Sequence, residues 1–194
     1  RRSVWMALGQ VTAINGAVWS FDHFVRRKPV YDISPQSMIA NIQRIPEWDT
    51  NPFPMNHLAH PYNGVLYYGS ARAEGFSFLE SSAFTFIGSL QWEYLWEVAP
   101  PAANDLYFTV LGGIALGESF GRLSAAMRAN RRGGLLGIGQ TLLGMGLDPG
   151  GSISRGVLGG RTPHAWALPD VRTRMRLGAS TGSVWLAHTD GQPG

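Results

Sequence analysis

The chain has 194 residues, of which 44% are apolar and 15% charged, and its formal net charge is +3. Ordinary soluble domains carry roughly 25% charged residues, so the deficit predicts either a large buried fraction or contact with lipid. The absence of Cys excludes disulfides and thiolate metal sites, and the arginines are too scattered along the chain to predict a nucleic-acid partner.

The first predicted element is a helix from Trp5 to Val25. The stretch from Ser3 to Phe21 has no charged residue and follows two arginines, which superficially resembles a signal peptide. Gln10, Thr12 and Asn15 interrupt its apolar character, so a core or interfacial helix is the favoured interpretation. Because the first residue is Arg1, we expect the chain to be cut from a longer protein.

A short helix is expected up to Gln43, with Ser34 as its N-cap and Pro35 at its first position. Residues 46–54 contain three prolines and predict a turn-rich loop. Pro61 disfavours helical backbone at the residue before it, so the sequence predicts a single turn from His57 to His60 and a separate helix from Gly64 to Glu74.

Three helices are expected in the middle of the chain, over 76–98, 105–130 and 135–147. Asn104 is the predicted N-cap of the second. The Asp-Pro-Gly-Gly run over 148–151 predicts a turn, and 153–158 a further short turn or helix. From Val171 to Leu177 apolar and arginine side chains alternate, which is typical of a strand. The expected fold is therefore mainly α: a compact, glycine-rich helical bundle over 1–160, followed by a strand-forming tail over 161–194 that begins a β-barrel or a sheet.

The helix predicted over 76–98 carries a polar stripe among aromatic residues. Ser82, Ser89 and Glu93 fall nearly in line, and Glu97 follows one turn later. Two buried carboxyls at this spacing predict that one has a raised pKa, which suits a general acid. The alternative is that one or both carboxylates pair with an arginine across a helix interface.

The next helix carries Gly113, Gly117 and Gly121, which clear one face for the close approach of another backbone. Glu118 lies beside this face with Arg122 four residues later, so either a surface ion pair or a buried one is expected. Asp105 follows two prolines, where a carboxylate at the start of a helix interacts favourably with the helix dipole.

His57 and His60 are spaced so that both can reach one metal ion. A zinc site needs at least three protein ligands, and the sequence does not show that Glu80, Glu93 or Glu97 supplies the third. The prediction is therefore that there is no metal site and no cofactor, with a metal-binding bundle as a minor hypothesis.

Several short motifs follow one another in the middle of the chain. They are Asn56-His57-x-x-His60-Pro61-Tyr62-x-Gly64-x-x-Tyr67-Tyr68-x-x-Ala71-Arg72-x-x-Gly75, Ser89-x-x-Trp92-Glu93-Tyr94-x-x-Glu97, Asp105 with Gly117-Glu118, and Asp148-Pro149 with Arg155. In this order, over roughly Trp48 to Arg155, the chain resembles a bacterial family known as the domain of unknown function numbered three-nine-four-three. Where that family often shows Pro-Ser, this chain has Pro101-Ala102.

The resemblance implies an envelope protein of Gram-negative bacteria, in the periplasm or outer membrane, and implies no activity. The positions that match the family motifs and also carry suitable chemistry are the candidate site. The catalytic candidates are His60, Glu93, Glu97 and Glu118, and the substrate-binding candidates are Tyr62, Arg72, Trp92 and Asp105.

Two functions follow as hypotheses. The first is a non-catalytic helical module of the cell envelope, attached to a β-barrel or sheet, with the outer membrane or lipid as its partner. The second is a hydrolase or transferase at the membrane interface, with His60 as base, Glu93 or Glu97 orienting it or acting as acid, and Arg72 binding an anionic group. The second requires His60, Glu93, Glu97 and Glu118 to converge around a cavity. The oligomeric state is left open.

Overall fold

The computed structural model describes residues 2–163 and Trp166, and this part of the chain is mainly α, as predicted. It contains helices and one isolated backbone bridge but no β-strand. The strands predicted in the tail lie outside the described residues. The α-helices are α1 (Val4–Ser20), α2 (Pro35–Ile42), α3 (His60–Ala73), α4 (Phe78–Gln91), α5 (Ala103–Tyr107), α6 (Gly113–Ala129), α7 (Gly134–Leu147) and α8 (Pro149–Val157).

Several of these helices continue directly into or out of a π-helical turn. These turns are η1 (Phe21–Arg26) after α1, η3 (Met55–Ala59) before α3, η4 (Trp92–Trp96) after α4, and η5 (Phe108–Gly112) between α5 and α6. A π-helical turn inserts one extra residue into the helix and re-aims the side chains around it, and such turns are frequent at functional sites.

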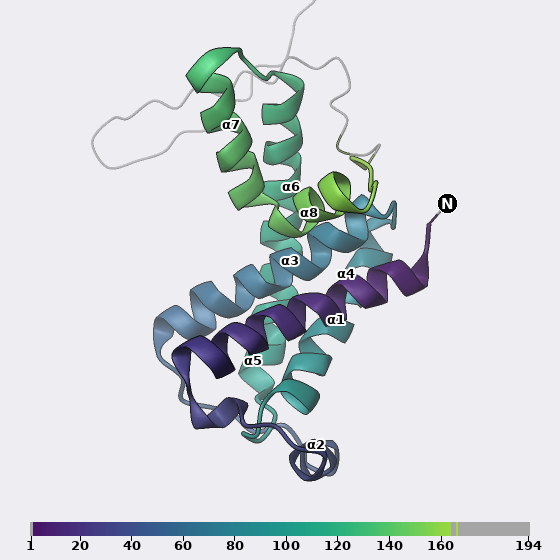
Figure 1. The fold of residues 1–194 in the computed structure, drawn as a ribbon. Helices are drawn as coiled ribbons and strands as arrows, with labels where there is room; N and C mark the ends of the chain where they lie inside the picture. The colour runs from purple at the N-terminus through teal and green to yellow at the C-terminus, as the bar shows by residue number, and fades with distance from the viewer. Residues whose placement is uncertain (1, 164–165, 167–194) are drawn as a thin grey trace, which may run out of the picture.

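Helix α3 lies at the centre of the molecule, and α1, α4, α6 and α8 pack around it (Figure 1). Eleven of its residues are buried, including Tyr67, Tyr68 and Arg72. The largest apolar cluster joins α3 to α1 and α4 and consists of Ala7, Val11, Tyr67, Ala71, Phe76 and Phe84. An amphipathic stripe alone would not predict this helix, because side chains are buried on every side of it.

The predicted glycine face of α6 is confirmed. A Cβ atom on Gly113 would lie 2.4 Å from the Cα of Gly64 in α3, so the two backbones touch. Gly117 faces the ring of Tyr68 in the same way, and Gly121 faces that of Trp166. Each glycine costs roughly 1 kcal/mol of helix propensity, which the close packing of α6 on α3 offsets.

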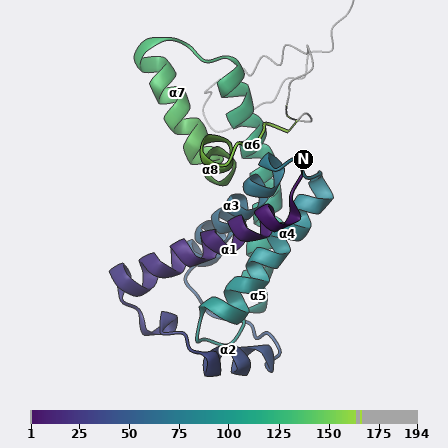
Figure 2. The same ribbon diagram turned by 45° about the vertical axis from the view of Figure 1, so that its right-hand side comes forward.

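The molecule is elongated, with α7 and the end of α6 forming a hairpin at one end and α2 at the other (Figures 1 and 2). The hairpin packs on the rest of the domain mainly through α6 and α8. Among the described residues, no helix combines the length and the apolar character needed to cross a lipid bilayer.

Three local predictions are wrong. Pro61 does not end a turn; it occupies the first turn of α3, where its missing N–H needs no partner. Residues 148–151 do not form a free turn, because α8 begins at Pro149 with Asp148 as its N-cap. Asn104 is not an N-cap but lies inside α5, whose N-cap is Ala102. In contrast, the predicted N-cap Ser34 is confirmed at α2; Ser77, which was not among the predicted caps, caps α4, and each forms a complete capping box.

Candidate functional site

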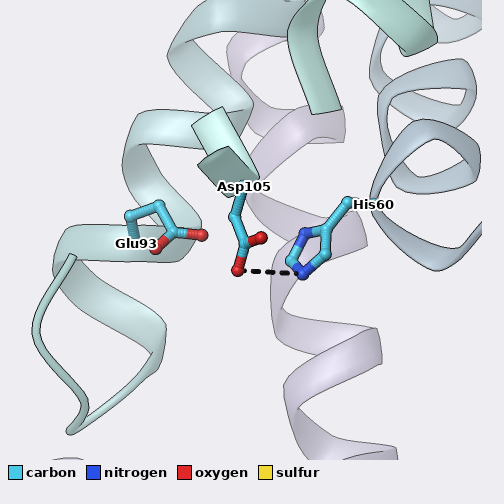
Figure 3. A group of neighbouring side chains, drawn as sticks. All are labelled: His60, Glu93 and Asp105. Atoms are coloured by element: carbon cyan, nitrogen blue, oxygen red, sulfur yellow. Dashed lines mark ion pairs between the residues drawn. The ribbon is translucent and has the colours of Figure 1, made fainter. Parts of the chain in front are cut away.

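His60, Glu93 and Asp105 come together from three separate elements (Figure 3). His60 begins α3, Glu93 belongs to η4 and Asp105 to α5. One nitrogen or oxygen atom of each side chain lies within 4.8 Å of one such atom on the other two. All three residues are buried, with exposed fractions of 7%, 2% and 4%. The three side chains therefore place nitrogen and oxygen atoms of the kind that bind metal ions close together and away from bulk water.

The imidazole of His60 is held on both sides. Its Nε2 atom lies 3.2 Å from the Asp105 carboxylate, and its Nδ1 atom lies 3.3 Å from the hydroxyl of Thr109. Thr109 is part of η5, one helical turn after Asp105. When Nδ1–H donates to Thr109, Nε2 points at the Asp105 carboxylate. A hydrogen bond of this kind fixes the orientation and the tautomer of a histidine that binds a metal ion through its other ring nitrogen.

The loop before α3 holds Asp105 from the other direction. The Glu47 N–H donates to the Pro101 carbonyl, and the Ala103 N–H donates to the Glu47 carbonyl, so this loop runs beside the start of α5. Asn104 then accepts from the Asp49 N–H at 2.9 Å and donates through Nδ2 to both the Asp49 and Asp105 carboxylates. The loop over 46–54 is therefore part of the site rather than a simple connection.

The two glutamates of the predicted stripe both have raised pKa values. Burial, the nearby Glu97 charge and that of Asp105 raise the pKa of Glu93 well above its usual range, although its carboxylate accepts a hydrogen bond from the Ala102 N–H at 2.8 Å. Burial also raises the pKa of Glu97 to about 7, against the opposing effect of the hydrogen bond from Trp92 Nε1. Both directions agree with the prediction from the stripe.

A pocket of about 460 Å³ opens beside this cluster. Its lining includes the ionisable side chains of His60, Glu97 and Asp105 together with aromatic and polar residues. Glu93 lies behind Asp105 and does not line the pocket. A pocket of this size accommodates a small molecule or the head of a larger one. Further polar residues on its wall are Asp22, Arg26, Lys28, Glu47, Asp49, Asn51 and Asn63.

The alternative interpretation of the stripe, in which one or both carboxylates pair with an arginine across a helix interface, is wrong. In the described part of the chain, neither Glu93 nor Glu97 takes part in an ion pair. The stripe itself is also shorter than predicted. Ser82 donates back to the Phe78 carbonyl of its own helix, whereas Ser89 is buried and Glu97 has left the helix in an extended conformation.

Glu118 and Arg72 lie in a second cluster, outside the pocket lining. The Arg72 Nε atom lies 3.3 Å from the Glu118 carboxylate, which also accepts from the Tyr68 hydroxyl at 2.7 Å and pairs with Arg122. Partial burial acts to raise the pKa of Glu118, but the hydrogen bonds to its carboxylate and the nearby Arg72 guanidinium outweigh it and lower the pKa. The predicted pair with Arg122 is thus confirmed, and the predicted convergence of Glu118 with His60 is wrong.

The remaining predicted residues differ in whether they line the pocket. Trp92 lines the pocket and donates to Glu97. Tyr62 is 41% exposed and donates to the Gly146 carbonyl at 2.6 Å, away from the pocket lining. His57 is exposed and stacks on Phe53 within η3, so the predicted pairing of His57 with His60 on one metal ion is wrong.

The site residues that sequence reasoning missed are Asp49, Asn51, Asn104 and Thr109. The Asn51 amide lies 3.4 Å from the Asp105 carboxylate and also contacts that of Asp49. A signal was present in the proline-rich loop, because its two carboxylates and one amide side chain, Glu47, Asp49 and Asn51, exceed what a turn needs. Thr109 carried no such signal, since its role depends on the π-helical turn that it occupies.

The comparisons with known proteins place this region in a family. Residues 45–150, more than half of the chain, match the family described as Domain of unknown function (DUF3943). The matched region includes His60, Glu93, Glu97 and Asp105. No curated protein and no solved structure matches the chain. The extent of the match shows that the chain belongs to the DUF3943 family.

Proposed function

We propose that this domain binds one divalent metal ion at His60, Glu93 and Asp105 and uses it in a hydrolase or transferase reaction in the bacterial cell envelope. The observation that carries the proposal is the convergence of these three side chains, all buried, from α3, η4 and α5. Catalytic metal sites commonly have three protein ligands and leave a position open for water or substrate.

The donor set favours a borderline or hard cation. One imidazole and two carboxylates suit Mn²⁺, Fe²⁺ or Zn²⁺ better than a soft ion such as Cu⁺. His60 and Asp105 are already 3.2 Å apart, which is close to the spacing of neighbouring ligands around an ion bound at about 2.1 Å. Thr109 supplies the orienting hydrogen bond that histidine ligands generally have.

The electrostatics of the cluster also favour a cation. Glu93 lies near Glu97, Asp105 and Asp49, and these negative charges raise its pKa together with burial. Among the described residues, only His60 forms an ion pair with Asp105. A metal ion would supply the positive charge that balances these carboxylates. Because metal binding releases protons from its ligands, the affinity should rise with pH.

Glu97 is the proposed proton carrier for a substrate in the pocket. It lines the pocket, and its pKa of about 7 lets it both accept and release a proton near neutral pH. The pocket wall also carries Lys28 and Arg26, of which Arg26 is paired with Asp22 at 2.7 Å, and these cations suit an anionic substrate group. These two residues replace Arg72 in that role, because Arg72 lies in the second cluster.

A second candidate is a non-catalytic helical module of the envelope, attached to a β-barrel or sheet. The large number of exposed apolar side chains in the described region favours it. In that function the His60–Asp105 pair only stabilises the fold. The two candidates differ in whether a metal ion binds.

The deciding experiment is a calorimetric titration of chelator-treated protein with Mn²⁺, Zn²⁺ and Mg²⁺. We expect one ion per chain for Mn²⁺ or Zn²⁺, with at least a hundredfold loss of affinity in Glu93→Gln. Thr109→Val should weaken binding by about ten- to a hundredfold through the orientation of His60. The matched control is Glu80→Gln, since this exposed glutamate is in the capping box of α4, a role that glutamine also fills.

Two outcomes would contradict the proposal. One is the absence of stoichiometric binding by the folded natural chain, which would leave the non-catalytic module as the better candidate. The other is an unchanged affinity in a folded Glu93→Gln variant, because an ion bound elsewhere on the surface would not depend on that carboxylate. Circular dichroism of each variant separates these results from simple unfolding.

A further inference from the structure

Helix α7 exposes its apolar half and buries its small residues. Six large apolar side chains cover roughly half of its circumference at 3.6 residues per turn, and Leu135, the most exposed, is 87% accessible. In a helix that packs on a soluble core, the apolar stripe normally faces inward. The exposed residues are Leu135, Leu136, Ile138, Leu142, Leu143 and Met145.

The opposite side of α7 explains how the helix is held in this orientation. Gly137 and Gly144 are buried, and the Ser124 hydroxyl of α6 donates to the Gly144 carbonyl at 2.7 Å. The contact with α6 thus uses glycine backbone and a hydroxyl group, and leaves the leucines outside. Contiguous exposed apolar surface of this kind marks a site of contact with another molecule or with a membrane.

The charged residues at the tip of the hairpin, before α7, are all arginines, and the one carboxylate that follows α7, Asp148, is buried and paired with Arg155. Arg131 and Arg132 are exposed at the tip of the hairpin, directly before the helix. Residues 119–147 contain four arginines, no lysine and no carboxylate. Within the described residues, neither Arg131 nor Arg132 forms an ion pair. Their charge therefore remains available to an anionic partner.

We propose that the α6–α7 hairpin docks on an anionic lipid bilayer, with α7 lying in the interface plane. Its 14 residues span about 21 Å, which is shorter than the roughly 30 Å of hydrocarbon in a bilayer. Leucine, isoleucine and methionine beside arginines are typical of a helix that lies on a membrane. The core of a docking surface for a protein would instead be enriched in aromatic residues, and α7 contains none.

The position of α7 supports this arrangement. The hairpin projects from one end of the elongated molecule, so it can reach a surface before the rest of the domain does (Figures 1 and 2). The His60 site lies in α3, η4 and α5, on the other side of the molecule's centre from α7. This inference does not depend on the metal ion and goes beyond the proposed function.

The absence of Cys from the natural chain allows a direct test. An environment-sensitive fluorophore is attached to Leu142→Cys, and the protein is mixed with vesicles of phosphatidylcholine containing 30% phosphatidylglycerol. We expect a blue shift and enhanced emission with these vesicles and little change with pure phosphatidylcholine. The same label on Thr50→Cys, an exposed position in the loop after α2, is the control and should not respond.

The charge contribution is measured with Arg131→Gln and Arg132→Gln combined. Because each arginine near an anionic surface contributes about 1 kcal/mol, the double variant should bind these vesicles about thirtyfold more weakly. Glu93→Gln should bind these vesicles as the natural chain does. A failure of the metal proposal can therefore be distinguished from a failure of the membrane proposal.

Three results would overturn the proposal. One is the absence of a spectral change at Leu142→Cys with either type of vesicle. Another is an emission that is already blue-shifted without lipid and depends on protein concentration, which would assign the face to a second copy of the chain. The third is an emission that is already blue-shifted without lipid but does not depend on protein concentration, which would show that another part of the chain covers α7.

Discussion

Two groups of buried ionisable side chains in this domain differ in how their charge is balanced. Asp148, the N-cap of α8, has its carboxylate 2.6 Å from the Arg155 guanidinium and also accepts from the Gly151 N–H. Glu93 is similarly buried and Glu97 is partly buried at the pocket, but neither has an arginine partner among the described residues, and burial raises the pKa of both. The first arrangement fixes a helix, whereas the second leaves two carboxyl groups without a counter-charge.

The largest expected effect lies in the balanced group. Asp148→Asn keeps an acceptor for the helix cap but leaves the Arg155 guanidinium buried without its counter-charge. Breaking a buried pair from one side typically costs about 3–5 kcal/mol, and we expect a loss of that size in the free energy of unfolding, measured with urea. A loss below about 1 kcal/mol, as expected for the exposed Glu80→Gln control, would show that water reaches the guanidinium.

The pH dependence of stability should report the unbalanced group. The folded state holds the Glu97 proton to about pH 7, whereas the unfolded chain releases it near 4.5. The folded state therefore binds more protons, so the unfolding free energy falls as the pH rises from about 4.5 to 7. The difference between the two pKa values corresponds to about 3 kcal/mol of unfolding free energy. Below pH 4.5 Glu97 is protonated in both states, so it no longer lowers the stability.

Chemical denaturation of metal-free protein across this pH range measures the effect. Glu97→Gln removes one of the two groups with a raised pKa and should make the fall smaller, leaving the part due to Glu93. Glu118→Gln should leave the fall between pH 4.5 and 7 in place, because the pKa of Glu118 is lowered rather than raised. A profile that is equally steep in Glu97→Gln would show that other groups cause it.

The smallest expected effect concerns Tyr62, which belongs to neither group. Tyr62→Phe removes the hydrogen bond to the Gly146 carbonyl in the last turn of α7. A partly exposed hydrogen bond of this kind contributes about 0.5–1 kcal/mol, so we expect a change of that order in thermal unfolding and no change in metal affinity. A tenfold loss of metal affinity would instead assign Tyr62 to the site, against its position in the structure.

Much of the helical fold follows from local sequence signals. Ser34 with Pro35 predicts the start of α2, and the paired glycines at 133–134 predict the break before α7. The sequence was misleading where a proline or an Asp-Pro pair begins a helix, because the same residues are typical of turns. Pro61 and Pro149 both occupy a first helical turn instead.

The site could be predicted only in part. A raised pKa followed correctly from two glutamates in an aromatic helix, but which residues converge depends on helix length and direction. Residues 103–129 form continuous helical structure, so Glu118 lies about 20 Å along the axis from Asp105 and cannot share its pocket. Tyr62 follows His60 by two residues, which turns it to the other side of α3. Periodicity could not reveal the π-helical turns that bring Glu93 and Thr109 to His60.

The contact between Gly64 and Gly113 has a consequence for the proposed metal site. His60 lies one turn before Gly64, and Asp105 lies about two turns before Gly113, so the distance between the two proposed ligands is set where the backbones cross. No side chain separates the helices there, so repacking of the core cannot bring the two helices closer together. A change in the ion that the proposed site prefers would therefore require a change of the ligands themselves.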